Sequence, residues 1–143
     1  MPQLPLFVFG TLRQGECNHH LLSGAFDRVQ SAKLREFARV ETLMIARQVN
    51  TVVDGELFDL TPSAYSRTLQ GCDYLEEIPV GELVGPEYRR IPVRVSTPSG
   101  DVVAWAYVRP DAEPDAVLRH LAEDELLRLA EICGHEVSPR PQV

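Results

Sequence analysis

Two stretches of the sequence hold groups whose types and spacing could do chemistry. The first is the apolar run Phe7–Phe9, followed by Gly10, Thr11, Leu12 and Arg13. A buried strand that ends in Gly-Thr leaves consecutive N–H groups without ladder partners, and such a turn can form an anion-binding concavity. Gly10 would let a ligand approach the backbone closely. The motif alone is not specific, because a plain tight turn uses the same residues.

The second stretch, residues 71–79, carries the carboxylates of Asp73, Glu76 and Glu77 among apolar side chains. Carboxylates flanked by apolar groups are candidates for a raised pKa, because loss of water disfavours the charged form. A carboxylate of that kind is suited to take a proton from an amine as a general base. The alternative interpretation is three solvated acids in a loop that follows a helix, as most Asp and Glu residues are exposed.

A third cluster, Cys17-Asn18-His19-His20, has two residue types that serve as nucleophiles or metal ligands. No third ligand shares the local pattern, so the sequence predicts neither metal binding nor catalysis here. Asn18 is instead expected to cap a short helix that runs to Leu22 and stops at Gly24.

The chain has 143 residues, with 14 Lys and Arg against 21 Asp and Glu, a formal net charge of −7. Arg89, Arg90 and Arg94 are the nearest approach to a basic patch, and we expect them to form a solvated face. Nucleic-acid binding needs clustered positive charge, so no nucleic-acid partner is predicted.

The three cysteines, Cys17, Cys72 and Cys133, match no zinc spacing and form no CxxC motif. Reduced thiols and a cytoplasmic location are therefore expected. The first ten residues lack the basic region of a secretory signal. No apolar run approaches the ~20 residues of a membrane helix, so no membrane partner is predicted.

The remaining pattern predicts the elements that would position these groups. Val52–Leu60 is predicted to be a strand with a bulge or a close backbone approach at Gly55. Thr61 and Pro62 are typical of a helix start, and that helix should run to about Leu69 and end at Gly71. Strand segments are also expected between residues 26 and 45.

Two β-rich runs, Ile91–Ser96 and Val102–Val108, are joined by turn residues and predict a hairpin. Trp105 and Tyr107 alternate along the second run, so both should point the same way and pack into a core. Residues 114–133 predict an amphipathic helix, followed by a frayed tail at 138–143.

A single domain spanning residues 1–143 is expected at this length. The predicted fold class is α+β: a small, mixed, mostly antiparallel β-barrel with two or three helices packed on it. An exposed stripe on the C-terminal helix could pair two copies as a homodimer.

Taken in order, these motifs resemble the γ-glutamylcyclotransferase family, in particular its γ-glutamylamine cyclotransferase subgroup. The resemblance covers about residues 6–108, and its specificity comes from five motifs in the correct order. These are Phe9-Gly10-Thr11-Leu12 with Gly15 and Asn18-His19 downstream, Gly55-Glu56-Leu57-Phe58, Asp73-x-x-Glu76, Tyr88-Arg89-Arg90, and Ala104-Trp105-Ala106-Tyr107.

The resemblance implies an enzyme in which the α-amine of a γ-glutamyl amide attacks its own γ-carbonyl and releases 5-oxoproline and an amine. Glu76 would be the general acid/base, and no metal or cofactor would be needed. The substrate would be held by residues of the first loop, Phe9, Gly10, Thr11, Leu12 and Arg13, and by Tyr88 and Tyr107.

Three departures from the family pattern leave alternatives open. Phe9 replaces the usual Tyr, so one hydroxyl is absent, and residues 26–49 lack the usual aromatic-Pro element. Glu77 directly follows Glu76, so a shift of one position would exchange their roles. The alternatives are a non-catalytic binding module of the same fold, and a pathway-specific enzyme that removes a γ-glutamyl protecting group.

Overall fold

Five strands close into a barrel in a computed structural model that describes residues 3–137, with side chains described to residue 132. Neighbouring strands are antiparallel except β1 and β5, which are parallel, so the predicted mixed and mostly antiparallel barrel is confirmed. Around the barrel the order is β1 (Leu6–Val8), β3 (Met44–Leu60), β2 (Phe26–Glu41), β4 (Arg89–Thr97) and β5 (Gly100–Val108).

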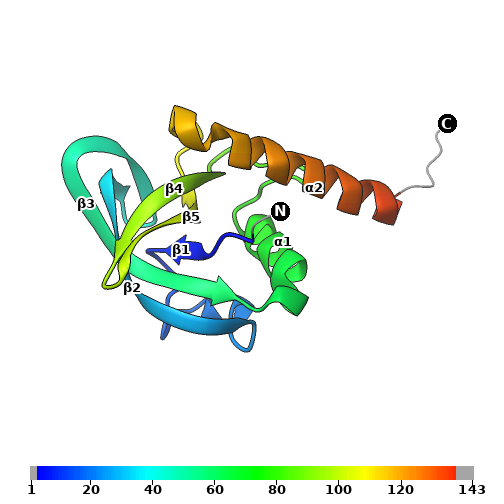
Figure 1. The fold of residues 1–143 in the computed structure, drawn as a ribbon, viewed down its shortest axis with the longest axis horizontal. Helices are drawn as coiled ribbons and strands as arrows, with labels where there is room; N and C mark the ends of the chain where they lie inside the picture. The colour runs from blue at the N-terminus through cyan, green and yellow to red at the C-terminus, as the bar shows by residue number, and fades with distance from the viewer. Residues whose placement is uncertain (1–2, 138–143) are drawn as a thin grey trace.

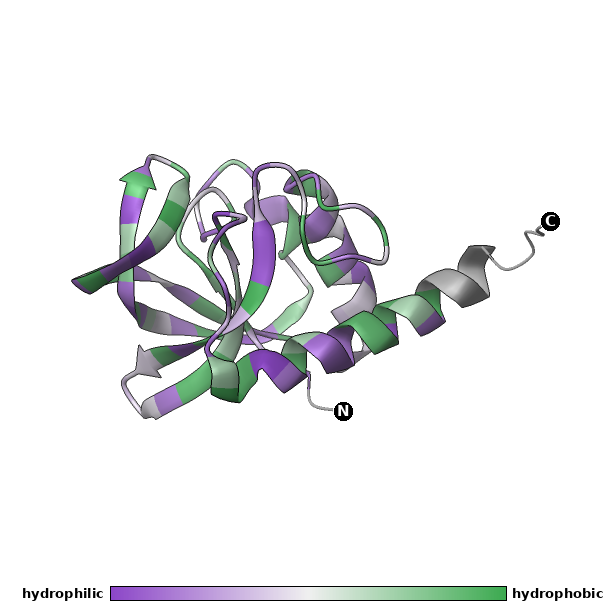
Figure 2. Ribbon diagram, turned by 90° about the horizontal axis from the view of Figure 1, so that it is seen from above, coloured by the Kyte–Doolittle hydropathy of each residue, from purple (hydrophilic) through white to green (hydrophobic). Residues whose placement is uncertain are grey.

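Two α-helices pack on this barrel (Figure 1). Helix α1 (Tyr65–Leu75) lies beside β1, and α2 (Arg119–Val137) crosses the barrel and projects beyond it, as Figure 2 shows from above. Short 3-10 turns cover His19–Leu21, Pro62–Ala64 and Ala116–Leu118. Among the described residues, no helix is both long enough and apolar enough to cross a bilayer.

Alternation along the strands divides the buried apolar side chains into two cores. On β1, Phe7 points into the barrel interior, whereas Leu6 and Val8 belong to a second core against α1. On β5, Trp105 and Tyr107 both join the second core, which confirms that they point the same way and pack internally. The second core therefore joins α1 to the outer wall of the barrel.

Gly55 marks the close backbone approach that the sequence predicts. A Cβ atom built there would lie 2.3 Å from the carbonyl oxygen of Val8, on the neighbouring strand β1. No real side chain tolerates that distance, so glycine is what allows β1 to lie against β3 at this point. The next residue, Glu56, accepts a 2.8 Å hydrogen bond from the N–H of Gln14 and so holds the loop after β1.

Helix ends differ most from the sequence expectations. Thr61 makes no side-chain cap, because its hydroxyl donates to Asp27 instead, and α1 continues through Gly71 to Leu75. Burial of this helix against the barrel outweighs the modest cost of a mid-helix glycine. Asp73 therefore lies within the helix and not in a loop after it.

The C-terminal helix also starts later than predicted, at Arg119 after a 3-10 turn, and it extends to Val137. The hairpin of β4 and β5 is confirmed. The strand segments expected between residues 26 and 45 belong to β2 and the start of β3, two long strands that pair with each other. The tail 138–143 and the side chain of Cys133 lie outside the described residues.

Candidate active site

A cavity of about 240 Å³ opens where the loop after β1 meets the end of α1. Four other parts of the chain complete its wall: Asn18, the turn between β2 and β3, the residue before β4, and β5. The lining residues are Phe7, Val8, Phe9, Gly10, Thr11, Leu12, Asn18, Leu43, Leu75, Glu76, Tyr88 and Tyr107. Every predicted site residue except Arg13 is among them.

The loop after β1 presents its N–H groups without partners. The carbonyl oxygen of Gly10 accepts hydrogen bonds from the N–H and the Nε of Arg13, at 3.1 and 3.0 Å. Within residues 3–137, no acceptor lies within hydrogen-bonding reach of the N–H groups of Gly10, Thr11 and Leu12. These three consecutive residues line the cavity, and their free N–H groups are the donors that the Gly-Thr motif predicts.

Asn18 and His19 hold that loop in place. Asn18 donates from its backbone N–H to the carbonyl of Thr11 and from Nδ2 to the Thr11 hydroxyl, both at 2.9 Å. Nδ1 of His19 lies 3.0 Å from the carbonyl of Leu12, which fixes Nδ1 as the protonated nitrogen because a carbonyl can only accept. Asn18 occupies the N-cap position of the 3-10 turn, as expected, but its side chain makes no capping hydrogen bond because it binds Thr11.

Glu76 is the carboxylate that lines the same cavity as these loop residues. It is the residue that follows the last turn of α1, and it is only partly exposed. Burial, with a further contribution from the negative charge of Asp73, raises its pKa from 4.5 to about 7. A carboxyl group with that pKa can both accept and return a proton near neutral pH.

Glu77, the next residue, is not part of the cavity wall. Its backbone takes a left-handed conformation, with φ of 61°, and its side chain is exposed outside the cavity. This sharp turn at the end of α1 sends the two neighbouring glutamates in different directions. The geometry therefore favours Glu76 over Glu77 as the carboxylate of the site.

Asp73 is held by two side chains of the barrel wall. Arg90 donates to both of its oxygens, from Nε at 2.8 Å and from Nη2 at 2.9 Å, and Tyr107 donates its hydroxyl at 2.6 Å. Burial, followed by the nearby charge of Asp73, raises the pKa of Tyr107 well above its usual value, so the phenol stays protonated. Because that proton is committed to Asp73, the Tyr107 oxygen can act only as an acceptor towards a ligand.

The expectation of a solvated arginine face is wrong for Arg90, whose exposed fraction is 0%. Arg90 and Arg94 do share one face of β4, but only the Arg90 end is covered by helices, and Arg94 remains exposed. The Arg90 guanidinium also lies 4.7 Å from the centre of the Trp105 ring. Strand alternation alone could not show which end of the strand is covered.

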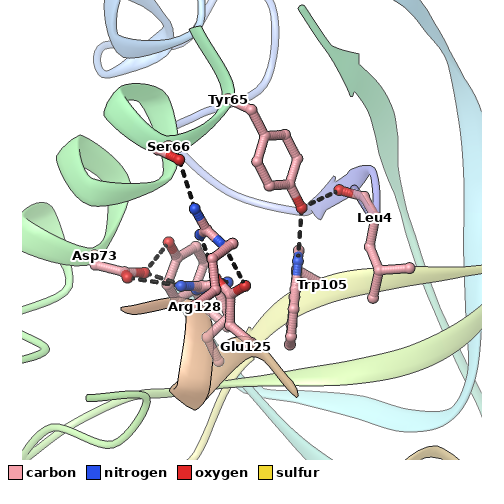
Figure 3. A network of polar contacts seen from close by, with 9 residues as sticks. Leu4, Tyr65, Ser66, Asp73, Trp105, Glu125 and Arg128 are labelled. Atoms are coloured by element: carbon pink, nitrogen blue, oxygen red, sulfur yellow. Dashed lines mark hydrogen bonds and ion pairs between the residues drawn. The ribbon is translucent and has the colours of Figure 1, made fainter. Parts of the chain in front are cut away.

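The other side of Arg90 faces α2. Its Nη1 lies 3.1 Å from a carboxylate oxygen of Glu125, and Glu125 in turn binds Arg128. Figure 3 shows Asp73, Glu125 and Arg128 converging between the two helices, with Ser66 of α1 bonded to Arg128. The sequence analysis missed this network. The available signal was a charged residue, Glu125, at a position in the apolar stripe of the helix.

The cavity's outer wall comes from the turn between β2 and β3. Leu43 lies over Gly10, and the Tyr88 hydroxyl donates a 2.6 Å hydrogen bond to the Leu43 carbonyl. Arg39 ties the same turn to the first loop by donating to the carbonyls of Thr42 and Phe9. Leu43 is a lining residue that the sequence analysis did not identify.

Arg13 is the one expected site residue that does not line the cavity. It binds Gly10 and lies 3.7 Å from Glu16. Among the described residues no group of His, Cys, Asp or Glu side chains is arranged to hold a metal ion. The described cysteines, Cys17 and Cys72, are free.

The sequence of this chain matches a known protein family. Residues 6–127 match the family model described as gamma-glutamyl cyclotransferase, AIG2-like. The chain belongs to this family. A provisionally named gamma-glutamylcyclotransferase of Vibrio cholerae is 33% identical over 108 residues, which are 72% of this chain and 79% of the relative.

Solved structures of the gamma-glutamyl cyclotransferase fold agree with the barrel. An Arabidopsis thaliana protein, At5g39720.1, matches with a TM-score of 0.57 and 18% identity over 99% of this chain and 97% of its own. YkqA of Bacillus subtilis matches with a TM-score of 0.58 and 22% identity, over 74% of this chain but only 35% of YkqA. A structure described as gamma-glutamyl cyclotransferase gives 0.50 and 17%, over 97% of this chain and 89% of that one. At these identities the likeness shows the fold alone.

Proposed function

We propose that this gamma-glutamyl cyclotransferase family member cyclises γ-glutamyl amides, and that Glu76 transfers the protons. One observation carries the proposal. A half-buried carboxyl with a pKa of about 7 and three free N–H groups line the same 240 Å³ cavity. This pairing supplies a base for an amine and donors for an anion, which are the two needs of the reaction.

The chemistry balances with these groups alone. Glu76 takes a proton from the substrate's α-ammonium, and the freed amine attacks the γ-carbonyl to close a five-membered ring. Glu76 then returns the proton to the leaving nitrogen as the amide bond breaks. The second proton of the attacking nitrogen passes to the released amine, so the products are 5-oxoproline and the amine as its ammonium ion. General acid/base catalysis of this kind contributes typically about 10²–10⁴-fold.

The N–H groups of Gly10, Thr11 and Leu12 have two alternative roles in this scheme. They bind either the substrate's α-carboxylate or the oxyanion that forms at the γ-carbonyl; loss of one oxyanion donor typically costs about 2.7–4 kcal/mol. Tyr107 lines the cavity and donates its hydroxyl proton to Asp73, so its oxygen would accept a hydrogen bond from the α-ammonium. Tyr88 and Leu43 would close over the curled substrate.

A screen of γ-glutamyl amides tests the proposal. The purified protein is incubated with γ-glutamyl amino acids, γ-glutamyl peptides and γ-glutamyl alkylamines, and 5-oxoproline and the released amine are both quantified. Stoichiometric release of both products from any member supports the proposal. Preference for alkylamines would place the chain in the γ-glutamylamine subgroup, and preference for one elaborate biosynthetic amine would favour the deprotecting enzyme.

The observation that motivates a non-catalytic alternative is Phe9. Its ring belongs to the barrel core and lies under the Arg39 guanidinium, with no hydroxyl to offer a substrate. A protein that binds γ-glutamyl compounds in calorimetry but releases no 5-oxoproline from any of them would be such a binding module.

A further inference from the structure

Glu125 is a buried charge in the apolar stripe of α2. It falls at helical spacing with Leu118, Leu121 and Leu129, and its exposed fraction is only 4%. A carboxylate at such a position costs free energy unless it is paired. The first question is therefore which charges Glu125 meets.

Glu125 meets two guanidinium groups of different kinds. Arg128, one turn along the same helix, donates to both carboxylate oxygens, at 2.7 and 2.6 Å. Arg90 comes from the barrel, and its Nη1 lies 3.1 Å from Oε2 of Glu125. That Nη1 makes no hydrogen bond among the described residues, so the ion pair with Glu125 is what compensates this end of a guanidinium that solvent does not reach.

The contacts continue from Arg90 to the cavity. Arg90 donates hydrogen bonds to both carboxylate oxygens of Asp73, and Asp73 accepts a further hydrogen bond from the hydroxyl of the cavity residue Tyr107. We propose that Glu125 is a positioning residue for the reaction, acting through Arg90 and Asp73 on Tyr107 and Glu76. The inference rests on the proposed function, and it makes the C-terminal helix part of the site's support.

Charge balance gives the direction of the effect. Arg90 is shared between two carboxylates, Asp73 and Glu125. If Glu125 is made neutral, one negative charge is lost beside Arg90, and the electrostatic potential that this cluster exerts on Glu76 becomes less negative. Glu76 would then ionise at lower pH, and the aligned pair of Asp73 and Tyr107 would shift.

Other titratable groups lie near Glu76. They must be considered before a shift of the Glu76 titration in a Glu125 variant is attributed to Asp73. Cys72 and Asp73 are on its own helix, Tyr88 comes from the segment before β4, and Tyr107 comes from β5. Of these, Asp73 is the one that contacts Arg90 by an ion pair. A Glu125 variant can therefore reach Glu76 by charge mainly along the Arg90–Asp73 route.

The test compares Glu125→Gln with Arg128→Gln in the full chain. Both substitutions break the Glu125–Arg128 pair on α2, but only the first removes the charge that faces Arg90. The ionisation of Glu76 is followed by NMR of a carboxyl-labelled protein, and kcat/KM for a γ-glutamyl amide is measured across pH. Thermal unfolding sets the temperature at which all variants are folded.

For Glu125→Gln we expect the Glu76 titration to move to lower pH and kcat/KM to fall by about tenfold or more, since small misplacements near a site can cost about 10²-fold. For Arg128→Gln we expect no movement to lower pH. Equal titrations in Glu125→Gln and the wild type would overturn the proposal, because a purely structural helix contact predicts that result.

Two further variants keep the test decisive. If Glu125→Gln does not fold, Glu125→Asp keeps the charge and should preserve the wild-type titration, whereas Asp73→Asn should move it to lower pH. The NMR titration needs no turnover. A wild-type chain that releases no 5-oxoproline would therefore refute the proposed function, while the titration would still decide the link from Glu125 to Glu76.

Discussion

Arg90 holds Asp73 by two parallel hydrogen bonds, of 2.8 and 2.9 Å, at a point where solvent does not reach the guanidinium. Bidentate pairs of this kind fix geometry as well as charge. Because Asp73 is in the last turn of α1, the pair fixes the end of the helix against the barrel. Glu76, at the end of that helix, is thereby directed into the cavity.

Replacing Glu76 by Gln should abolish 5-oxoproline release and leave the fold intact, because the amide keeps the shape of the side chain but cannot accept a proton as a base. Activity is measured by product release and folding by circular dichroism. Glu77→Gln is the matched control, since Glu77 lies outside the cavity, and it should stay active. An active Glu76→Gln beside an inactive Glu77→Gln would shift the base by one residue.

The pH dependence should follow Glu76. The base must be ionised, so kcat/KM should rise as pH increases through a midpoint near the pKa of about 7. The same pKa can be tested independently, by comparing the free energy of unfolding of Glu76→Gln with that of the wild type at several pH values. A wild-type midpoint near 4.5, the ordinary value for glutamate, would contradict the burial of this carboxyl.

For that stability measurement the sign follows from the raised pKa. The folded state binds the Glu76 proton more tightly than the unfolded state, so wild-type stability from this group is complete below about pH 4.5 and is lost as pH rises to about 7. The free energy of unfolding of Glu76→Gln relative to wild type should increase over that interval and then level off. Its upper bound is about 3 kcal/mol at about 1.36 kcal/mol per pKa unit, reduced by partial exposure. Urea unfolding at several pH values measures it.

Arg90→Met should destabilise the protein by about 3–5 kcal/mol, because it leaves buried carboxylates without their partner. Arg94→Met is the control on the same face of β4, and it should change stability by no more than about 0.5 kcal/mol since Arg94 is exposed. Chemical denaturation gives both values. Equal effects of the two substitutions would mean that Arg90 is solvated in solution.

Two glycine substitutions should have opposite signs. Gly55→Ala would place a Cβ 2.3 Å from the Val8 carbonyl, so β1 must move and stability should fall by more than about 2 kcal/mol. Gly71→Ala, inside α1, would meet only Leu21 at 4.0 Å and should stabilise by about 0.5–1 kcal/mol. A Gly55→Ala protein with a Tm equal to or above that of the wild type would contradict the close approach of β1 and β3.

Thr11→Pro should impair substrate binding, because proline removes one of the three free N–H donors of the first loop. Thr11→Ala is matched to it: the N–H remains, and only the hydroxyl that accepts from Asn18 is lost. Steady-state kinetics should show a raised KM or lowered kcat chiefly for the proline variant. Unchanged constants for Thr11→Pro would remove this loop from the mechanism.

The sequence by itself determined the features that are local along the chain. Alternation on β4 and β5 predicts the hairpin, and the Gly-Thr turn after β1 predicts free N–H groups, because strand periodicity and glycine geometry act between near neighbours. The apolar surroundings of residues 71–79 indicate Asp73, Glu76 and Glu77 as candidates, and only the resemblance to the family's Asp-x-x-Glu motif singles out Glu76. A glycine inside a strand predicts either a bulge or a close backbone approach at Gly55, and the structure shows the close approach.

Only the tertiary structure decided which charges lose contact with water. Arg90 and Arg94 have the same residue type and the same strand face, yet one is fully buried and the other exposed. Glu125 and Leu43 likewise acquire their partners from segments far away in the sequence. The physical reason is that the solvation of a charge depends on which elements cover it, and that covering is set by packing between helices and barrel, not by the local pattern.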